Sequence, residues 1–100
     1  MNVIIAGTMR TPPENLAAIK PHMRTMLDTT RAEDGCIQYS YAEDVMEPGL
    51  IHIFEVWRDQ ASLDAHIASA HMTTWRAAGN SLGVSDRRLV NYQIAAQRAV

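Results

Sequence analysis

The chain has 100 residues, a hydrophobic fraction of 47% and a formal net charge of −2 at pH 7. This length predicts a single domain over residues 1–100, and the slightly acidic balance excludes the basic surface that nucleic-acid-binding proteins use. The longest apolar run, residues 3–6, is too short for a membrane span or a signal-peptide core, so we expect a cytoplasmic protein without nucleic-acid or membrane partners.

The first predicted strand covers residues 3–10, which begin with β-branched side chains and alternate between two faces. Gly7 is unusual inside a strand and indicates a bulge, a tight packing contact or the close approach of a ligand. Thr11 follows, with Pro12 at the first helical position and Glu14 three residues after Thr11. This spacing predicts a capping box that starts a helix.

The first predicted helix runs from this cap to residues 33–35, where Gly35 can adopt the left-handed conformation that ends helices. Pro21 lies inside its apolar stripe, and because the stripe continues beyond Pro21, we expect a kink there rather than an end. His22 lies beside the stripe and is interpreted as a surface or edge histidine. The stripe consists of Leu16, Ile19, Met23, Met26, Leu27 and Thr30.

The second predicted strand, residues 36–44, places Ile37, Tyr39 and Tyr41 on one face. The two tyrosines could present their hydroxyls to a cavity or simply pack. Cys36 is the single cysteine, which excludes an intramolecular disulfide and a thiolate metal site. We interpret it as a small buried hydrophobe.

A turn signal at residues 46–49 joins this strand to a third one, residues 50–58. A glutamate on a covered face is costly unless it is paired, so Glu55 is predicted to lie either at a subunit contact or in a pocket. Both faces of the strand are largely apolar, and we expect both to be covered. One face carries Ile51, Ile53, Glu55 and Trp57, and the other carries Leu50, His52, Phe54 and Val56.

Asp59 is the predicted N-cap of a second helix, which Ser69 is expected to break while capping a further helical segment. After a loop at residues 80–83, residues 84–93 alternate and predict the last strand. The apolar stripe of the first segment is formed by Leu63, His66, Ile67 and Ala70, and that of the second by Met72, Trp75, Arg76 and Gly79.

The element order β-α-β-β-α-β predicts an α+β fold of the ferredoxin-like split type, with an antiparallel four-stranded sheet and helices on one face. Nothing within the chain is left to cover the other face. We therefore expect a homodimer in which two sheets face each other and form a dimeric α+β barrel. The apolar tail, residues 95–100, could extend the last strand across the partner.

Several short motifs occur in order along nearly the whole chain: Glu33-x-Gly35-Cys36 with Tyr39, then Glu55-x-Trp57, then Leu63-x-x-His66-x-x-x-x-His71-Met72. In these motifs the chain resembles the antibiotic biosynthesis monooxygenase (ABM) family, and in particular its quinol monooxygenases. The resemblance implies a dimeric α+β barrel that oxidises a quinol-like or phenolic aromatic with O2 and needs no metal or flavin.

This chemistry requires a base, a hydrogen-bonding clamp and a dry apolar pocket, because the deprotonated phenol itself passes electrons to oxygen. A histidine with a pKa near ~6.5 suits proton abstraction near neutrality, so the candidate catalytic residues are His66 and His71. We expect the pocket between the sheet and the broken helix, with His66 as the base and the more exposed His71 as a clamp or entrance residue. The candidate substrate-binding residues are Trp57, Tyr39, Tyr41, Trp75 and Glu55.

The sequence argues against a metal or another cofactor. His66 and His71 lie five residues apart, which is about 140° round a continuous helix, so they would diverge unless the break at Ser69 brought them together. No Asp or Glu stands nearby at matching spacing, and no Gly-rich phosphate-binding loop is present. In haem-degrading relatives of this fold, the places of the haem-site residues correspond here to Arg76, Gly7 and His66, which disfavours haem.

Two alternatives stay open. An isomerase of a small hydroxy-carbonyl compound could use the same histidines as proton shuttles, and a non-catalytic dimeric module could bind a small molecule. Isomerases of phosphorylated substrates need basic residues at the pocket. Arg76 is the only candidate in the second helical region, which favours an apolar aromatic.

Overall fold

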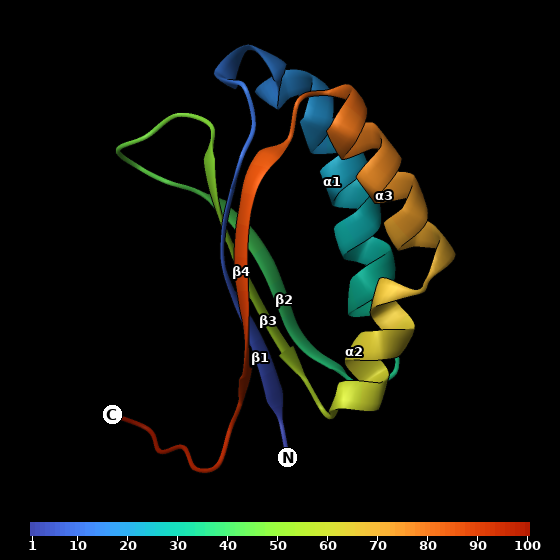
Figure 1. The fold of residues 1–100 in the computed structure, drawn as a ribbon, viewed down its shortest axis with the longest axis vertical. Helices are drawn as coiled ribbons and strands as arrows, with labels where there is room; N and C mark the ends of the chain where they lie inside the picture. The colour runs from blue at the N-terminus through green and yellow to red at the C-terminus, as the bar shows by residue number, and fades with distance from the viewer.

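The computed structural model describes residues 1–100 as four strands and three α-helices, in the predicted order (Figure 1). No helix combines the length and the apolar character that crossing a bilayer requires. The strands are β1 (Val3–Arg10), β2 (Cys36–Glu43), β3 (Leu50–Trp57) and β4 (Ser85–Gln93). The helices are a 3-10 turn (Pro13–Asn15), α1 (Leu16–Arg31), α2 (Gln60–Ile67) and α3 (Ala70–Ser81).

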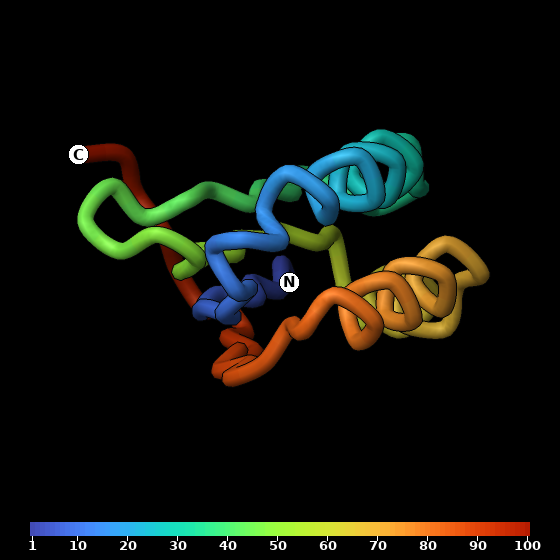
Figure 2. The backbone as a smooth tube through the Cα atoms, turned by 90° about the horizontal axis from the view of Figure 1, so that it is seen from above, coloured from blue at the N-terminus to red at the C-terminus, as the bar shows by residue number.

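The four strands form one antiparallel sheet in the order β2-β3-β1-β4, so the first strand lies in the middle and the last at an edge. The register places Val3 opposite Trp57 of β3 and opposite Gln93 of β4. All helices lie on one face of the sheet (Figures 1 and 2). The predicted ferredoxin-like α+β fold is therefore confirmed.

The hydrophobic core lies between this helical layer and the inner face of the sheet. Trp57 and Ile19 are fully buried, and Ile51 and Ile53 are at most 2% exposed. Burying large aliphatic and aromatic side chains of this kind contributes about 1.5–3 kcal/mol each, so the core is the main source of stability. Its other members are Val3, Met9, Met26, Tyr39, Leu63, Met72 and Trp75.

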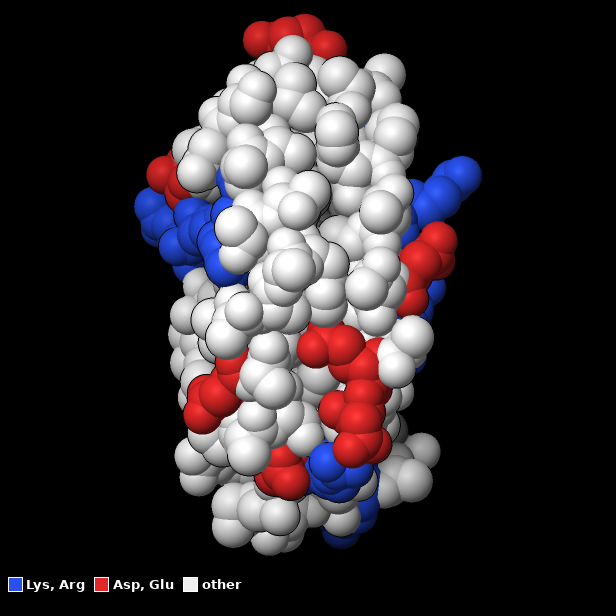
Figure 3. Space-filling view, turned by 90° about the vertical axis from the view of Figure 1, so that its right-hand side faces the viewer, with Lys and Arg blue, Asp and Glu red and all other residues white.

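The outer face of the sheet is not covered within the chain. Phe54, Val90 and Tyr92 point to this side and are 37%, 49% and 52% exposed. The expectation that both faces of β3 are covered therefore holds within one chain only for the helix-facing side. On the helical side, the central surface is largely free of charged side chains, and acidic groups gather toward one end (Figure 3).

The predicted capping box at Thr11 is wrong. The backbone N–H of Thr11 donates to the carbonyl of Gly49 at 2.8 Å, which ties this residue to the β2–β3 hairpin. Its side chain is buried, and the hydroxyl has no hydrogen-bond partner. The chain enters α1 through the 3-10 turn instead, and Asn15 Nδ2 donates to the carbonyl of Leu82 at 2.8 Å.

The predicted common face of Ile37, Tyr39 and Tyr41 is also corrected, because β2 contains an irregularity at its start. Cys36 pairs with Trp57 and Gln38 pairs with Val56, so β2 has one extra residue, Ile37, between two neighbouring positions of β3. The insertion turns Ile37 outward, where it is 57% exposed, while Tyr39 is 2% exposed. Cys36 packs against the core instead, as a partly buried side chain.

Gly7 and Pro21 are residue types that are unusual inside a strand and a helix. Gly7 lies so close to β4 that an added Cβ would stand 1.9 Å from the carbonyl oxygen of Arg88. This contact supports the packing interpretation of Gly7. Helix α1 continues through Pro21 rather than ending there, as expected, and the kink at Pro21 stays a prediction.

Candidate active site

The last residues of β3 lead directly into the helix that carries His66. Asp59 is the N-cap of α2, as predicted, and its Oδ1 accepts from the Ser62 backbone N–H at 2.8 Å. The neighbouring Arg58 makes two bonds, of 3.1 and 3.2 Å, to the carboxylate of Asp34, just after α1. These contacts fix the start of α2 against the end of α1.

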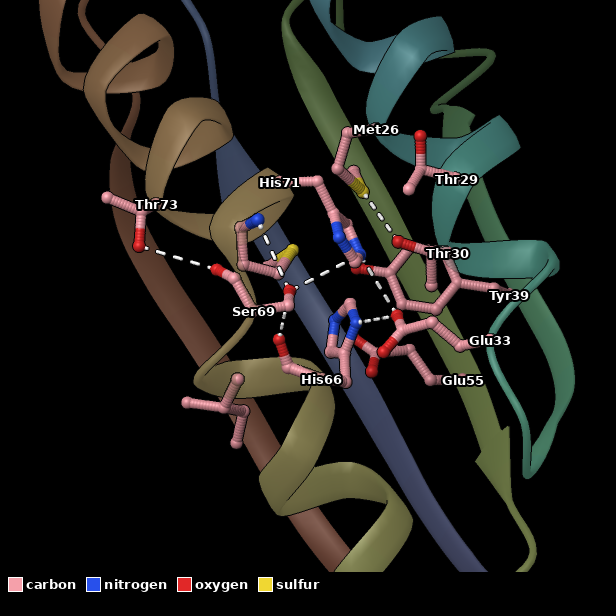
Figure 4. Close-up of polar contacts among 12 residues, drawn as sticks. Met26, Thr29, Thr30, Glu33, Tyr39, Glu55, His66, Ser69, His71 and Thr73 are labelled. Carbon is pink, nitrogen blue, oxygen red and sulfur yellow. Dashed lines mark hydrogen bonds and ion pairs between the residues drawn. The ribbon is translucent and has the colours of Figure 1, made fainter.

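Ser69 breaks the helical region between His66 and His71, as predicted. Its hydroxyl donates to the His66 carbonyl at 2.6 Å and accepts from the Met72 N–H at 3.4 Å, which caps α3. The change of direction turns both imidazoles to the same side (Figure 4). The break at Ser69 thus brings the two histidines together, the exception to the divergence expected on a continuous helix.

Glu33 stands between the two histidines (Figure 4). Its Oε2 lies 2.6 Å from His66 Nδ1 and 3.0 Å from His71 Nε2. The side chains of His66, Glu33 and His71 are 2%, 18% and 20% exposed, so the cluster is largely screened from solvent. The relative exposure of the two histidines agrees with the sequence prediction.

The sequence placed Glu33 only at the end of the first helix and missed this contact. Glu33 lies 33 and 38 positions before its two partners, so no local period links them. The one sequence signal for the position of Glu33 was its place two residues before Gly35 at the end of the first helix. Gly35 takes a φ of 87° there and turns the chain immediately after Glu33.

The protonation of His66 follows from its surroundings. Burial lowers its pKa, and the hydrogen bond and negative charge of Glu33 act in the opposite direction. We assign the neutral tautomer that donates from Nδ1 to Glu33, because an ionised carboxylate can only accept. The other ring nitrogen, Nε2, is then unprotonated and can accept a proton.

A cavity of about 280 Å³ lies between the inner face of the sheet and the α2–α3 region, where the sequence predicted a pocket. Tyr39, Tyr41, Glu55 and His66 line it, so four of the predicted site residues meet in one place. The remaining lining residues are Ile5, Leu63, Ile67, Met72, Arg76, Arg87 and Leu89. Ile67 was predicted on the buried stripe, but it lies at the margin of this cavity and is 50% exposed.

Trp57 does not line the cavity. It is fully buried, its Nε1 donates to Glu55 Oε1 at 2.9 Å, and its ring centroid lies 4.7 Å from that of His66. Trp57 therefore holds Glu55 and His66 in place from behind rather than forming a wall for a ligand.

His71 and Trp75 line a second cavity, of about 240 Å³, between α1 and α3. His22 and Met26 contribute to it from α1, so His22 lies at an edge as predicted. Trp75 is 1% exposed and its Nε1 has no hydrogen-bond partner. The Glu33–His66–His71 cluster thus links the walls of two separate cavities.

The two tyrosines and the glutamate that line the first cavity have raised pKa values. Burial raises the pKa of Tyr39 and of Tyr41, whose hydroxyl oxygens lie 3.4 Å apart. Burial also raises the pKa of Glu55 to about 7, although the Trp57 hydrogen bond and the charge of Arg87 oppose the shift. The tyrosines are therefore hydrogen-bond donors, and Glu55 can carry a proton at neutral pH.

The same cluster has the composition of a metal site, because one carboxylate and two histidines offer ligand atoms within 4.8 Å of one another. The sequence argument against a metal relied on diverging histidines and on the lack of a nearby acid. The break at Ser69 removes the first ground, and the position of Glu33 removes the second. In the structure, hydrogen bonds to Glu33 already satisfy one nitrogen of each histidine.

Comparison with known proteins gives a consistent family match. The model of the family described as "Antibiotic biosynthesis monooxygenase" matches residues 2–78. The solved structure of a "putative antibiotic biosynthesis monooxygenase" from Deinococcus radiodurans superimposes with a TM-score of 0.89 and 26% sequence identity, covering 100% of this chain and 98% of that one.

Two sequence relatives are similar over only part of their own length. "Uncharacterized protein sll1783" from Synechocystis is 29% identical over 93 residues, which cover 93% of this chain and 63% of the relative. "Putative monooxygenase Rv0793" from Mycobacterium tuberculosis is 35% identical over 65 residues, which cover 65% of this chain and 63% of the relative. The chain thus matches under two thirds of the length of each.

Proposed function

Because the chain belongs to the antibiotic biosynthesis monooxygenase family, we propose that it is a monooxygenase that oxidises a quinol-like or phenolic aromatic with O2 and without a metal or organic cofactor. The observation that carries this proposal is the Glu33–His66 pair at the wall of the sheet cavity. The partly buried carboxylate of Glu33 accepts from Nδ1 of the buried His66, which lines the cavity, and this leaves Nε2 of His66 unprotonated for a ligand.

His66 is the general base in this proposal. Its Nε2 takes the phenolic proton, and Glu33 stabilises the resulting imidazolium through the 2.6 Å contact at Nδ1. The electron-rich phenolate then transfers one electron to O2, which gives a phenoxyl radical and superoxide. These two radicals combine to give a ring peroxide. The peroxide loses water, and His66 returns the proton.

The proposed reaction balances without a further reductant. A quinol and O2 give a hydroxylated quinone and water, with one oxygen atom in the ring and the other in the water molecule. The quinol supplies all four electrons. One of the Tyr39 and Tyr41 hydroxyls donates to the other, which leaves one hydroxyl proton to donate to a substrate oxygen. The apolar side chains from α2 and α3 keep the phenolate away from water.

His71 is proposed to act on Glu33 rather than on the substrate, because it lines the second cavity. It shares Glu33 Oε2 with His66, which holds the carboxylate in position. This assignment replaces the clamp or entrance role expected from the sequence. Trp75 likewise belongs to the second cavity and has no proposed contact with substrate.

We also propose a homodimer joined through the outer faces of the two sheets. The exposed apolar side chains on that face support it, because contiguous apolar patches on a sheet are unusual in a monomer. Sedimentation should give twice the chain mass of 11.1 kDa at micromolar concentration. A stable monomer under these conditions would refute the dimer.

An isomerase of a phosphorylated hydroxy-carbonyl compound is a second candidate, and one observation favours it. Arg87 joins Arg76 at the cavity, which supplies the second basic residue that the sequence did not reveal. A non-catalytic binding module would use the same cavity without turnover.

The test of the proposed function is oxygen uptake with a reduced naphthoquinone, corrected for uncatalysed oxidation, together with identification of the hydroxylated product. We expect uptake that depends on His66 and that persists in His22→Ala, a matched control in which a histidine of the second cavity is removed. Uptake that is equal in the wild type and in His66→Ala would reject His66 as the base. No uptake with any electron-rich phenol, but turnover of a phosphorylated hydroxy-carbonyl compound, would favour the isomerase.

A further inference from the structure

Two arginines contribute to the cavity between the sheet and the α2–α3 region. Arg76 comes from α3 and Arg87 from β4, the edge strand of the sheet. These two elements face each other across the side of the cavity that no further strand closes. The cavity is therefore bordered by positive charge on both sides of this edge.

Neither arginine has an acidic partner. Arg76 donates only to the carbonyl of Ile67 at 3.1 Å and to the Thr73 hydroxyl at 3.4 Å. Arg87 makes no side-chain hydrogen bond and no ion pair, whereas Arg10, Lys20 and Arg58 each have a carboxylate partner. A guanidinium that becomes shielded from water when a ligand fills the cavity requires a new partner, because burying an unpaired charge is costly.

The charges of the two arginines act inside the cavity. Arg76 contributes to the lowered pKa of His66, and Arg87 opposes the raised pKa of Glu55 and of Tyr41. Because Glu55 can be neutral near pH 7, the cavity carries two positive charges and at most one negative charge. Its field therefore favours an anion.

The rest of the cavity favours an aromatic ring. Its walls are mostly aliphatic or aromatic, contributed by the sheet and by both helices. A sugar phosphate would bury several hydroxyls against Ile5, Leu63 and Met72, which offer them no hydrogen bonds. A ring that carries one anionic group satisfies both the apolar walls and the arginines.

We propose that the substrate is a hydroxylated aromatic acid, whose carboxylate binds Arg76 and Arg87 while its phenolic hydroxyl faces His66. This inference rests on the proposed function, since it names the substrate class of the same site. A carboxylate fits the planar fork of a guanidinium through two parallel hydrogen bonds. The arginines thus determine specificity, and His66 performs the proton transfer.

The test compares three stable naphthalene ligands that differ in charge: hydroxynaphthoate, naphthol and naphthyl phosphate. Their binding to the purified protein is measured by calorimetric or fluorescence titration, without turnover. We expect hydroxynaphthoate to bind about 10- to 100-fold more tightly than naphthol, the range expected for charge-assisted hydrogen bonds. Arg87→Gln should remove most of this preference.

Three variants control the experiment. Arg76→Gln should also reduce the preference, whereas Arg76→Lys keeps the charge and should retain a larger part of it. Arg24→Gln changes the net charge equally on α1, outside this cavity, and should leave all affinities unchanged. Thermal unfolding identifies any variant that has lost the fold.

Several outcomes would overturn the proposal. Equal binding of naphthol and hydroxynaphthoate would refute it, as would an Arg24→Gln effect as large as that of Arg87→Gln. If the arginine variants weaken naphthol as much as hydroxynaphthoate, the arginines serve the phenolic oxygen instead. Tightest binding of naphthyl phosphate would assign the site to phosphate esters.

The two proposals fail separately in these experiments. Loss of the acid preference with oxygen uptake on a neutral quinol would remove only the substrate class. A strong acid preference without any oxygen uptake would remove the monooxygenase and keep the anion site.

Discussion

The two faces of β3 have similar apolar sequences but different surroundings. On the inner face, Ile53, Glu55 and Trp57 are at most 5% exposed beneath the helices. On the outer face, Phe54 is 37% exposed and no segment of the chain covers it. The inner face also gathers Glu55 and the buried tyrosines beside His66, and the outer face has no comparable cluster.

This difference separates two roles within one strand. A covered face lowers the local dielectric constant, which perturbs titratable groups and strengthens hydrogen bonds, as chemistry requires. An uncovered apolar face can only pack, so it supports assembly. Substitutions on the two faces should therefore change different measurements.

The largest expected effect lies on the inner side of the sheet, at His66, the proposed base. His66→Ala should reduce the oxidation rate by roughly 10²–10⁴-fold, because general base catalysis contributes this much. The circular dichroism spectrum and the sedimentation coefficient should stay those of the wild type. If the rate is unchanged while stability falls, His66 is a packing residue.

Substitutions on the outer face of the sheet should change the affinity of the proposed dimer. Phe54→Asp places a charge in the proposed interface and should weaken the dimer by about 100-fold or more, since an unpaired buried charge costs several kcal/mol. Val45→Asp, at a hairpin position that is 97% exposed, is the matched control and should leave the dimer intact. Equal sedimentation of both variants would place the interface elsewhere.

Glu55 should determine part of the pH dependence of stability. Its pKa is raised from 4.5 to about 7, so the folded chain holds a proton that the unfolded chain loses as pH rises through this window. The resulting loss in the free energy of unfolding grows from pH 4.5 and levels off above pH 7. It reaches up to about 3 kcal/mol, at 1.36 kcal/mol per pKa unit.

Glu55→Gln cannot ionise and keeps an oxygen to accept from Trp57. It should therefore raise the unfolding temperature above pH 7 and leave it nearly unchanged at pH 4.5. A stabilisation that is equal at both pH values would show that the ionisation of Glu55 is not its cause.

Glu33→Gln should reduce the rate by about 10- to 100-fold, because glutamine keeps an oxygen that can accept from His66 but lacks the negative charge that stabilises the imidazolium. Glu33 raises the pKa of His66, so its removal should also move the acid limb of the pH–rate profile to lower pH. Asp34→Asn is the control, because Asp34 is next to Glu33 in the sequence but is bonded to Arg58. It should change neither the rate nor the position of the acid limb. A shift of the limb to higher pH would contradict the assigned contact.

The smallest effect is expected at the β2 irregularity. Ile37→Asn should change the free energy of unfolding by about 0.5 kcal/mol or less, because the side chain points outward and is 57% exposed. A loss of several kcal/mol on chemical denaturation would place Ile37 in a covered interface.

The sequence predicted the features of the fold that depend on the periodicity of apolar residues and on helix caps. The alternation in β3 placed Glu55 and Trp57 on one common face, which the structure shows to be the inner face. The cap residues Asp59 and Ser69 located the two helical segments that carry the histidines. The fold class followed from the order of these elements. The cavity followed from placing His66 beside Leu63.

The errors arose where long-range contacts override local patterns. Thr11 matches a capping box, but its backbone bond to Gly49 fixes it before α1 begins. Ile37 fits the alternation of Tyr39 and Tyr41 in the sequence, but the extra residue at the start of β2 turns its side chain to the other face. Arg87 is a charged residue on an exposed strand, so no local signal distinguished it from a surface arginine.

The shared contact of Glu33 with both histidines also has a consequence for the order of folding. Its two hydrogen bonds close chain segments of 33 and 38 residues, whereas the caps at Asp59 and Ser69 act within three residues. Long closures cost more chain entropy and form later than local turns. After dilution from denaturant, helical circular dichroism should therefore recover before the proposed oxidation activity, and the return of that activity would report the final docking of α1 against the α2–α3 junction.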